Sequence, residues 1–511
     1  MSERGARPPE SLWLATTEAT DYDPLEGGLE VDTAVVGGGI TGLTAALQLV
    51  EAGQTVAVIE ADRIVTGATG YTTAKVTSQH GLIYDDLLST FGREKARQYA
   101  AANEAAIDEV ETRVGELGID CDFERRPAYT YAAEDGDLDA VRAEAEAAAA
   151  LGLPAEVVEA TELPFDVPGA VRFDDQAQFH PRSYLLAIAE EVRGDGSYVL
   201  EETRARDVDP GSPCEVETSR GAVVADDVIV ATQFPFFDRN GYFARMHPKQ
   251  AYLLAVRIDG TPPRGMYYGA GSPPWTLRSH PVEGEDLLLV GGQGHETGEN
   301  DPPTSERYRR CESFAREHFD VESVEYRWST HDYYSVDRVP FVGPLGPTTE
   351  NVYVGTGFGG WGMTGGTAAG LILSELVRAG AHPWADVFDP LRVAPRASAK
   401  RFVRENADTA GHFVGDWADA LRSSADLPSV GEATVIREGG RPYGVYRDGD
   451  GRVHGVSAVC PHMKCVLRWN DAERTWDCPC HGSRFTHEGE VLSGPAVDDL
   501  PRRPPNADRD G

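Results

Sequence analysis

Four residues near the carboxyl end have the types and the spacing of a metal centre. Cys460 and His462 are followed, after fifteen residues, by Cys478 and His481. Two thiolates and two imidazoles ligate the [2Fe–2S] centres in which histidines replace two cysteines on one iron, a replacement that raises the reduction potential. A zinc site with two cysteines and two histidines is the alternative. Zinc fingers usually pair Cys with Cys and His with His, whereas each half of this pattern supplies one of each, which favours the iron–sulfur centre.

Two further cysteines and a serine extend this pattern. The segments CPHMKC (460–465) and CPCHGS (478–483) resemble the Rieske domain pattern C-x-H-x-x-C and C-P-C-H-G-S. The resemblance implies a Rieske [2Fe–2S] cluster, a disulfide between Cys465 and Cys480 that links the two cluster loops, and a hydrogen bond from Ser483 to a cluster sulfide. A normally reducing cytoplasm argues against the disulfide, unless burial keeps its potential below about −300 mV.

A glycine-rich turn near the amino end has the spacing of a dinucleotide-binding motif. Gly37, Gly39 and Gly42 follow an apolar strand and open a helical segment, and a second apolar strand ends at Glu60. Such glycines permit a tight turn and a close approach of the backbone to a pyrophosphate, and the helix N-terminus stabilises the phosphate charge. A carboxylate at Glu60 would accept hydrogen bonds from both ribose hydroxyls. A solvated acid at the end of a strand is the alternative.

The same region, about residues 30–380, resembles the glycine/D-amino-acid-oxidase-like flavoprotein family. The resemblance lies in the segments VVGGGITG, TGATGYTTA, VIVAT, VDRVPFVGP and VGTGFGGWGMTGG. It implies FAD as the cofactor, with Thr69 near the phosphates and Gly357, Gly359 and Gly360 beside the isoalloxazine. A helix that begins after these last glycines would stabilise the anionic reduced flavin through its dipole. A plain tight connection between a strand and a helix is the alternative for this second glycine turn.

The residues that would act on a substrate are only weakly specified. Tyr252 and Arg278 lie in the expected substrate domain, where relatives use Tyr and Arg to clamp a carboxylate, and His331 lies close to the flavin-facing motif. We take these three residues as catalytic candidates, with a surface ion pair or a core tyrosine as the alternative. Three neighbours of His331 in the sequence share its place near this motif: Tyr333, Tyr334 and Arg338.

Lysine is rare in this chain, which has five lysines and 42 arginines. Lys75 in TTAKVTSQH and Lys249 in HPKQAY therefore stand out, although chance placement explains them equally well. Some relatives bind flavin covalently through a cysteine, and some place a lysine beside the flavin for oxygen chemistry. The corresponding segments here, 326–340 and 286–298, contain neither residue. By analogy, these absences argue against an oxidase that uses oxygen.

The chain of 511 residues has a formal net charge of −36. An acidic, lysine-poor surface suits a halophile with a very salty cytoplasm, where charge repulsion is screened within about 3 Å at molar ionic strength. An acidic protein of an ordinary cell is the alternative. The charge disfavours nucleic acid and anionic lipid as partners. Because neither a signal peptide pattern nor an apolar run of about 18 residues is visible, we expect a cytoplasmic protein without an integral membrane segment.

The motifs divide the chain into domains. We expect an FAD-dependent oxidoreductase domain at 1–395, a linker at 396–426 and a Rieske [2Fe–2S] domain at 427–511. The predicted fold is an α/β FAD-binding domain, Rossmann-like and of the glutathione-reductase type, with an interleaved α+β substrate domain, plus a small all-β Rieske domain. We expect the FAD-binding parts at about 30–90, 150–240 and 330–390, and the substrate-domain parts at about 91–150 and 241–329.

Together these features predict an FAD-dependent oxidoreductase that oxidises a small amine, amino acid or hydroxy compound and passes electrons from the flavin to the Rieske cluster. The electrons would leave to a quinone, a ferredoxin or another redox protein. Two alternatives remain open: an oxidase that uses oxygen, with an accessory Rieske domain, and a redox shuttle or sensor without an organic substrate. A Rieske oxygenase is excluded, because its mononuclear iron site needs a further domain and only thirty residues follow His481.

Overall fold

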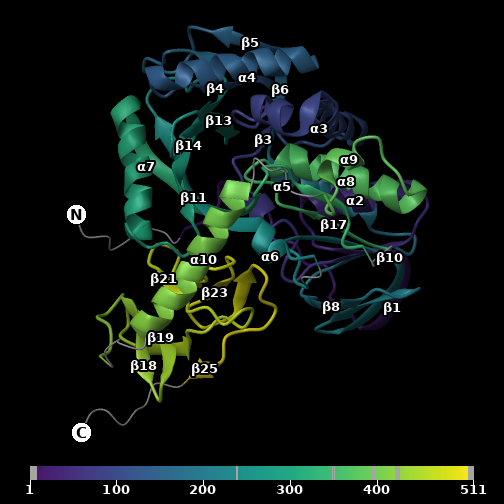
Figure 1. Cartoon of the computed structure of the whole chain (residues 1–511), viewed down its shortest axis with the longest axis vertical. Helices are drawn as coiled ribbons and strands as arrows, with labels where there is room; N and C mark the ends of the chain where they lie inside the picture. The colour runs from purple at the N-terminus through teal and green to yellow at the C-terminus, as the bar shows by residue number, and fades with distance from the viewer. Residues whose placement is uncertain are drawn as a thin grey trace.

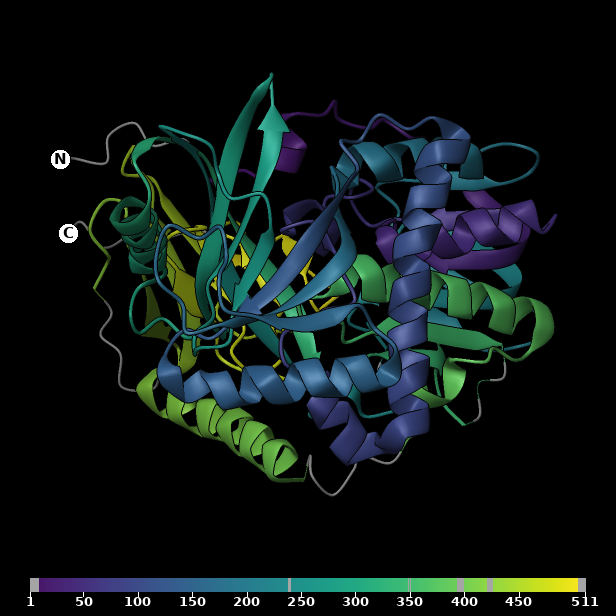
Figure 2. The same ribbon diagram turned by 90° about the horizontal axis from the view of Figure 1, so that it is seen from above.

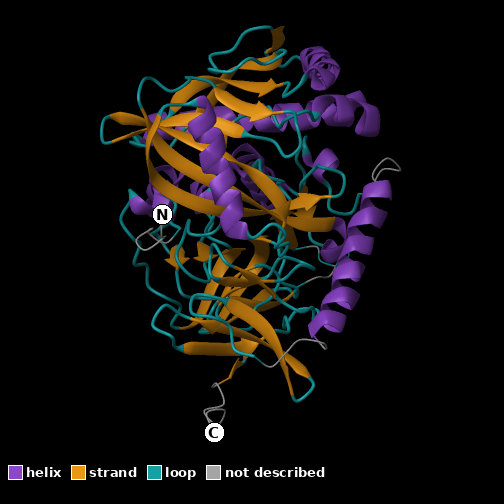
Figure 3. Cartoon of the chain, turned by 90° about the vertical axis from the view of Figure 1, so that its left-hand side faces the viewer, coloured by secondary structure: helices purple, strands orange, loops and turns teal. Residues whose placement is uncertain are grey.

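The computed structural model describes residues 9–237, 240–347, 349, 351–392, 399–420 and 426–503. Two large β-sheets with their helices form one part of the molecule, and a smaller β body packs against one end of it (Figure 1). Figure 3 shows the long helix α10 (Ala399–Ala420) along one side, reaching from the large sheets to the small β body.

The first large sheet contains both glycine turns at its strand ends. Its strands follow the order β16-β17-β10-β1-β2-β7, in which β17, β10, β1, β2 and β7 are parallel to one another and the edge strand β16 is antiparallel to β17. Helices α2, α5 and α8 pack together against it, and the hairpin β8–β9 extends from β10. The strands are β1 (Gly27–Val36), β2 (Val56–Ile59), β7 (Tyr198–Leu200), β8 (Ala205–Asp209), β9 (Cys214–Thr218), β10 (Gly221–Gln233), β16 (Phe341–Pro344) and β17 (Val352–Thr356). The helices are α2 (Ile40–Glu51), α5 (Pro181–Val192) and α8 (Gly362–Ala379).

Burial explains why these strands form the centre of the first sheet. All four residues of β2 and the last four of β1 are buried. Continuous apolar runs of this kind are typical of parallel strands that are covered on both faces. The short helices α1 (Leu12–Ala15) and α9 (Ala385–Phe388), and the 3₁₀ turn η1 (Ala68–Tyr71), complete this part.

The second large sheet forms the wall opposite the glycine turns. Its order is β15-β11-β14-β13-β12-β4-β6-β3, with β5 on β6. Helix α7 packs on β11 and β14, and Figure 2 shows α3 and α4 crossing at the outer side of the molecule. The strands are β3 (Lys75–Val76), β4 (Glu124–Tyr131), β5 (Ala155–Val158), β6 (Ala170–Gln178), β11 (Met246–Ile258), β12 (Met266–Gly269), β13 (Thr276–Val282), β14 (Glu285–Glu296) and β15 (Val321–Ser335). The helical elements are α3 (Tyr84–Leu117), η2 (Asp135–Asp137), α4 (Leu138–Leu151), α6 (Tyr242–Arg245) and α7 (Thr304–His318).

The small β body contains two antiparallel sheets of four strands each. Its apolar core is built around the buried side chains of Trp476 and Phe485 and includes all four motif cysteines. The first sheet consists of β18 (Ala433–Glu438), β19 (Arg441–Arg447), β20 (Val453–Ser457) and β25 (Arg502–Arg503). The second consists of β21 (Arg468–Asn470), β22 (Thr475–Asp477), β23 (Arg484–Thr486) and β24 (Val491–Ser493).

This architecture confirms the predicted fold class. One α/β sheet interleaves along the chain with a second sheet, and a small all-β body follows. Most of the predicted linker is the helix α10, and the predicted start of that linker at 396 lies outside the described residues. Among the helices that the structure describes, none combines the length and the apolar character needed to cross a membrane.

Candidate flavin cavity and iron–sulfur centre

The first glycine turn leaves no room for side chains. It joins the end of β1 at Val36 to the start of α2 at Ile40. A Cβ on Gly37, whose φ is +114°, would lie 2.5 Å from the Ala231 carbonyl oxygen. A Cβ on Gly42 would lie 1.9 Å from the Gly37 carbonyl oxygen. The bare backbone at the start of α2 is therefore accessible to a phosphate, whose charge a helix N-terminus stabilises.

Glu60 follows β2 and directs its carboxylate to the same turn. Its Oε2 accepts a hydrogen bond from Gly38 N at 2.8 Å, and its Oε1 accepts one from Asp62 N at 3.2 Å. Burial raises the pKa of the Glu60 carboxyl above its ordinary value. A carboxylate held beside the turn fits the ribose of a bound dinucleotide better than it fits a freely solvated acid.

The second glycine turn connects β17 to α8, which begins at Gly362. Gly357, Gly359 and Gly360 have φ values of +79°, +60° and +86°, a region that glycine adopts without strain. Gly360 N donates a hydrogen bond of 2.5 Å to Asp332 Oδ2. Burial raises the pKa of Asp332 to about 6.

Both turns face one cavity of about 330 Å³ between the large sheets. Gly39 and Thr69 line it from the first region, and Gly359 and Gly360 line it from the second. Thr69 Oγ1 also accepts a hydrogen bond of 3.3 Å from Ile40 N at the start of α2. Four other predicted cofactor residues lie in or beside the two glycine turns but do not line the cavity: Gly37, Gly42, Glu60 and Gly357.

Charged and aromatic side chains of the second sheet and its loops form the opposite wall of the cavity. Lys75 comes from β3, Lys249 from β11 and Asp332 from β15. Neither lysine lies on β14 (Glu285–Glu296), the strand that corresponds to the position of the oxygen-site lysine in some relatives. The aromatic members of this wall are Tyr252, Tyr268 and Tyr334, whereas Trp361 lines the cavity from the second glycine turn, at the start of α8.

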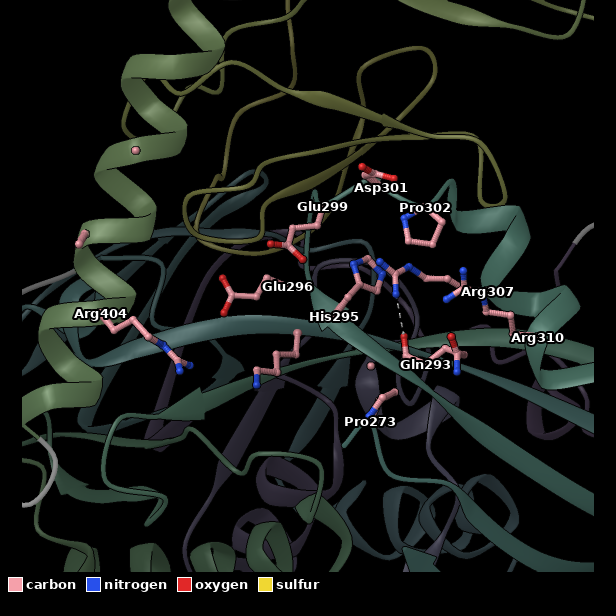
Figure 4. A pocket seen from close by; sticks show the side chains of 14 residues that line it. Pro273, Gln293, His295, Glu296, Glu299, Asp301, Pro302, Arg307, Arg310 and Arg404 are labelled. Carbon is pink, nitrogen blue, oxygen red and sulfur yellow. Dashed lines mark hydrogen bonds between the residues drawn. The ribbon is translucent and has the colours of Figure 1, made fainter. Parts of the chain in front are cut away.

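A wider pocket of about 770 Å³ adjoins this cavity between β14, α7 and α10 (Figure 4). Lys249, Pro273 and Gly294 line both spaces. The pocket is the more open of the two spaces, and it adjoins the cavity at these three shared residues. Its charged lining is mixed and comprises Glu296, Glu299 and Asp301 with Arg307, Arg310 and Arg404.

The structure separates the three catalytic candidates. Tyr252 lines the flavin cavity, but its hydroxyl lies 3.0 Å from His295 Nε2. Arg278 is 1 % exposed and lies over the Trp13 ring, outside the cavity lining. His331 also lies outside the lining, and burial lowers its pKa to about 3. Asp332 lines the cavity but was not among the predicted site residues. Asp332 and His331 are neighbours in the sequence, and only the alternation of side chains along β15 places the first in the cavity and the second on the other face.

The four predicted cluster ligands come together at one end of the small β body. Cys460 and Cys478 are buried, and their thiols share a hydrogen bond that lowers the pKa of Cys460 and raises that of Cys478. The imidazole rings of His462 and His481 have centroids 5.1 Å apart. Two cysteine sulfurs and two imidazoles in one place are the donor set of a [2Fe–2S] cluster in which histidines replace two cysteines on one iron.

The loops around the ligands are arranged to hold charged sulfur. Backbone N–H groups of His462 and Met463 hydrogen-bond to the Cys460 sulfur, and so does the Ser483 hydroxyl. Cys465 and Cys480 form a disulfide with an S–S distance of 2.05 Å, which joins the two cluster loops. These contacts stabilise negative charge on the sulfur atoms.

The cluster loops pack directly against the second large sheet. The Tyr333 hydroxyl donates a hydrogen bond of 2.9 Å to the His481 carbonyl oxygen. Gly482 lies so close to the sheet that a Cβ on it would be 2.5 Å from Pro248 Cβ and 2.8 Å from His331 Nε2. His331 and Tyr333 therefore contact the cluster loop.

Further hydrogen bonds hold the small β body in this position. Thr304 Oγ1 of α7 lies 2.6 Å from Asn470 Oδ1, and Trp417 Nε1 of α10 donates to the Lys464 carbonyl oxygen at 3.0 Å. Arg468 also pairs with Asp416 of α10 at 2.6 Å. The interface therefore includes both α7 and α10.

Family models match almost the whole described chain. The model described as FAD dependent oxidoreductase (DAO) matches residues 32–376. The chain belongs to this family. A second model, for the Rieske [2Fe-2S] domain, matches residues 417–504. Members of the first family bind FAD, and the Rieske domain binds a [2Fe–2S] cluster, so FAD and a [2Fe–2S] cluster are the cofactors of this chain.

Curated relatives and solved structures agree with these models. The Rieske 2Fe-2S iron–sulfur protein YhfW of Bacillus subtilis (strain 168) is 38 % identical to this chain, over 96 % of this chain and 97 % of its own length. Gamma-glutamylputrescine oxidoreductase of Escherichia coli (strain K12) is 27 % identical over 71 % of this chain and 87 % of its own. The structure of L-amino acid deaminase from Proteus vulgaris aligns with a TM-score of 0.59, at 19 % identity, over 75 % of this chain and 98 % of its own, which shows a shared fold.

Proposed function

We propose that the protein is a dehydrogenase that oxidises the C–H bond next to the nitrogen of a small amine or amino acid. Its electrons then pass from FAD to the Rieske cluster. Two similar proteins support this donor class by their names: gamma-glutamylputrescine oxidoreductase and L-amino acid deaminase. Gamma-glutamylputrescine and L-amino acids both have a C–H bond next to a nitrogen. A hydroxy compound is the second donor class of this proposal.

One observation carries the electron path. Successive residues of a β-strand point to opposite faces, and β15 uses both. Thr330, Asp332 and Tyr334 line the flavin cavity. His331 and Tyr333, on the other face, contact the cluster loop. A single strand thus separates the two cofactor sites.

The protein residues position the partners of this transfer. FAD supplies a two-electron acceptor for hydride, and the cluster supplies a carrier that takes one electron at a time. Tyr333 holds the loop that contains His481 against β15 through its hydrogen bond of 2.9 Å. Three residues that lie between the two sites are buried: His331, Tyr333 and His481.

The two histidines of the cluster have different surroundings, which suggests an entry side and an exit side for electrons. His481 is 5 % exposed and belongs to the interface with β15. His462 is half-buried, and the next residue, Met463, is 44 % exposed. We infer that electrons enter near His481 and leave near His462 to a quinone, a ferredoxin or another redox protein.

The proposal includes Cys460, His462, Cys478 and His481 as the ligands of the cluster. Purified protein should contain iron and inorganic sulfide and give a Rieske-type EPR signal after reduction. His481→Cys should lower the midpoint potential or lose the cluster, because a thiolate replaces a neutral imidazole. Bound zinc without iron or sulfide would exclude this assignment.

Anaerobic mixing with a panel of amines, amino acids and hydroxy acids tests the function. A substrate should bleach the flavin first and the cluster second, at a rate that does not depend on protein concentration, because the domains share one chain. Bleached flavin beside an oxidised cluster, with peroxide formed once air is admitted, would favour the oxidase. A flavin that no compound on the panel reduces, but that exchanges electrons with a partner protein, would favour the shuttle.

A further inference from the structure

Lys75 is a buried lysine in the wall of the flavin cavity. It is 7 % exposed and forms half of the short strand β3. Among the described residues, no carboxylate pairs with its amine. Lysine is almost never buried without a partner, because a desolvated ammonium is costly. A buried lysine without a carboxylate partner in the wall of a cavity is a candidate functional group.

The Lys75 amine makes two hydrogen bonds, which leave one further position on its nitrogen without a partner. Nζ donates to the Tyr267 carbonyl oxygen at 2.5 Å and to Thr276 Oγ1 at 2.5 Å. Thr276 Oγ1 uses its own proton toward the same carbonyl oxygen, at 3.2 Å, so it accepts from the lysine. A neutral amine has two N–H donors and one lone pair. With both donors engaged, the lone pair is what remains.

The surroundings of Lys75 favour this neutral form. Burial, assisted by the charge of Arg278 on β13, holds the pKa of Lys75 well below its ordinary value. Arg278 is itself buried, and burial lowers its pKa to about 9. The other neighbours of the amine, the Tyr267 carbonyl and the Thr276 hydroxyl, carry no charge in this range.

We propose that Lys75 is the base that accepts a proton from the ammonium group of an amine substrate in the flavin cavity. This inference rests on the proposed function. An ammonium nitrogen has no lone pair, whereas a free amine can stabilise the positive charge that develops when hydride leaves the adjacent carbon. A base inside the cavity therefore lets the protein use amines that are protonated in solution.

The atoms and electrons of this step balance. One N–H proton moves to the Lys75 Nζ lone pair, and the substrate nitrogen keeps the bonding electrons. The neighbouring C–H bond then breaks, and its hydrogen leaves with both electrons to FAD, which is reduced. The substrate is oxidised to an iminium, which water hydrolyses to a carbonyl compound and ammonia or an amine. Lys75 finally returns its proton to solvent.

The first test is the pH profile of anaerobic flavin bleaching by an amine from the panel that reduces the wild-type holoprotein. Lys75→Met keeps the bulk of the side chain but cannot take a proton, and Lys75→Arg keeps a cation that does not act as a base. Both variants should bleach at least tenfold more slowly at neutral pH. Their rates should rise about tenfold per pH unit toward the pKa of the amine itself. Lys95→Met, which removes a surface lysine paired with Asp386, should match the wild type.

A second readout needs no substrate and no turnover. If Lys75 is neutral in the folded holoprotein, the unfolded chain binds one more proton up to the lysine pKa of about 10.4. Folding stability then rises with pH below that value. The unfolding equilibrium constant of the wild type, relative to Lys75→Met, should fall about tenfold per pH unit between pH 8 and pH 10. Five other titratable groups of the cavity occur in both proteins and cancel in this ratio: Lys249, Tyr252, Tyr268, Asp332 and Tyr334.

The outcomes separate this inference from the proposed function. If an amine bleaches the wild type and Lys75→Met with the same rate and pH profile, the base is not Lys75, but the function stands. An unfolding ratio that does not change with pH would mean a protonated Lys75 and would also overturn the inference. If no amine bleaches the wild-type flavin, the proposed function fails, and the base assignment fails with it.

Discussion

Ser483 affects the potential of the cluster through a single hydroxyl group. That hydroxyl hydrogen-bonds to the Cys460 sulfur. A donor to a ligand sulfur stabilises the more negative, reduced cluster and so raises its potential. Ser483→Ala should lower the midpoint potential by tens of millivolts, where about 59 mV corresponds to a tenfold change for one electron. Potentiometric titration followed by EPR measures the shift, and an unchanged midpoint would contradict it.

Tyr333 acts on the position of the cluster loop through its bond to the His481 carbonyl. Tyr333→Phe removes a hydrogen bond that contributes about 0.5–1.5 kcal/mol. Electron transfer from flavin to cluster should therefore slow by roughly two- to tenfold, while bleaching of the flavin by substrate is unchanged. Stopped-flow absorbance resolves the two phases.

Tyr84→Phe provides a matched control for this variant. Tyr84 is also buried, and its hydroxyl donates to a backbone carbonyl, that of Ser78, at 2.7 Å. It belongs to α3, away from the cluster loops. Equal slowing of electron transfer in both variants would indicate a general loss of stability and would remove Tyr333 from the path.

The two ends of β14 provide a test of how the Rieske domain docks on the second large sheet. Gly284 and Gly298 flank this strand and have φ values of +86° and +84°. A Cβ on Gly298 would lie 2.8 Å from Pro479 Cα in the cluster loop, whereas a Cβ on Gly284 would meet nothing within 4 Å. Gly298 therefore contacts the Rieske domain and Gly284 does not, while the backbone φ angles of the two glycines are nearly equal.

Gly298→Ala should push the cluster loop away from the sheet and slow reduction of the cluster. Gly284→Ala should have the same backbone cost, about 1 kcal/mol, but leave electron transfer at the wild-type rate. The comparison is made by stopped-flow mixing with substrate or, without one, by photoreduction of the flavin. Identical kinetics in the two variants would show that the docked arrangement is not the one that transfers electrons.

The same elements show what could be predicted from the sequence. The glycine turn at 37–42 and the segments 460–465 and 478–483 are local patterns, because neighbouring residues in the chain create each site. Their cofactors were therefore predicted correctly. The wall of the flavin cavity is assembled from β3, β11 and β15, which are distant in sequence. The roles of Lys75 and Asp332 depend on strand register and on the pleat, and neither is visible in the residue order.

The whole molecule brings the candidate flavin cavity and the candidate cluster ligands to opposite faces of one sheet. Helices α7 and α10 each bond to the small β body, through Thr304 and Trp417. The predicted linker is largely the helix α10 and not an extended tether. A helix that is bonded at its far end restricts a swinging motion, so the docked arrangement is the expected resting state of the full chain.

The net charge of −36 leads to a prediction for the whole chain. Repulsion among excess carboxylates destabilises the compact state, and salt screens it, with a Debye length of about 10 Å at 0.1 M and about 3 Å at 1 M. Raising KCl from 0.1 M to 1 M should therefore increase the urea midpoint of unfolding, and most of the gain should be complete near 1 M. Strengthened burial of apolar surface would instead keep increasing the midpoint at higher salt. A midpoint that does not change with KCl would contradict the expectation of a protein suited to a halophile.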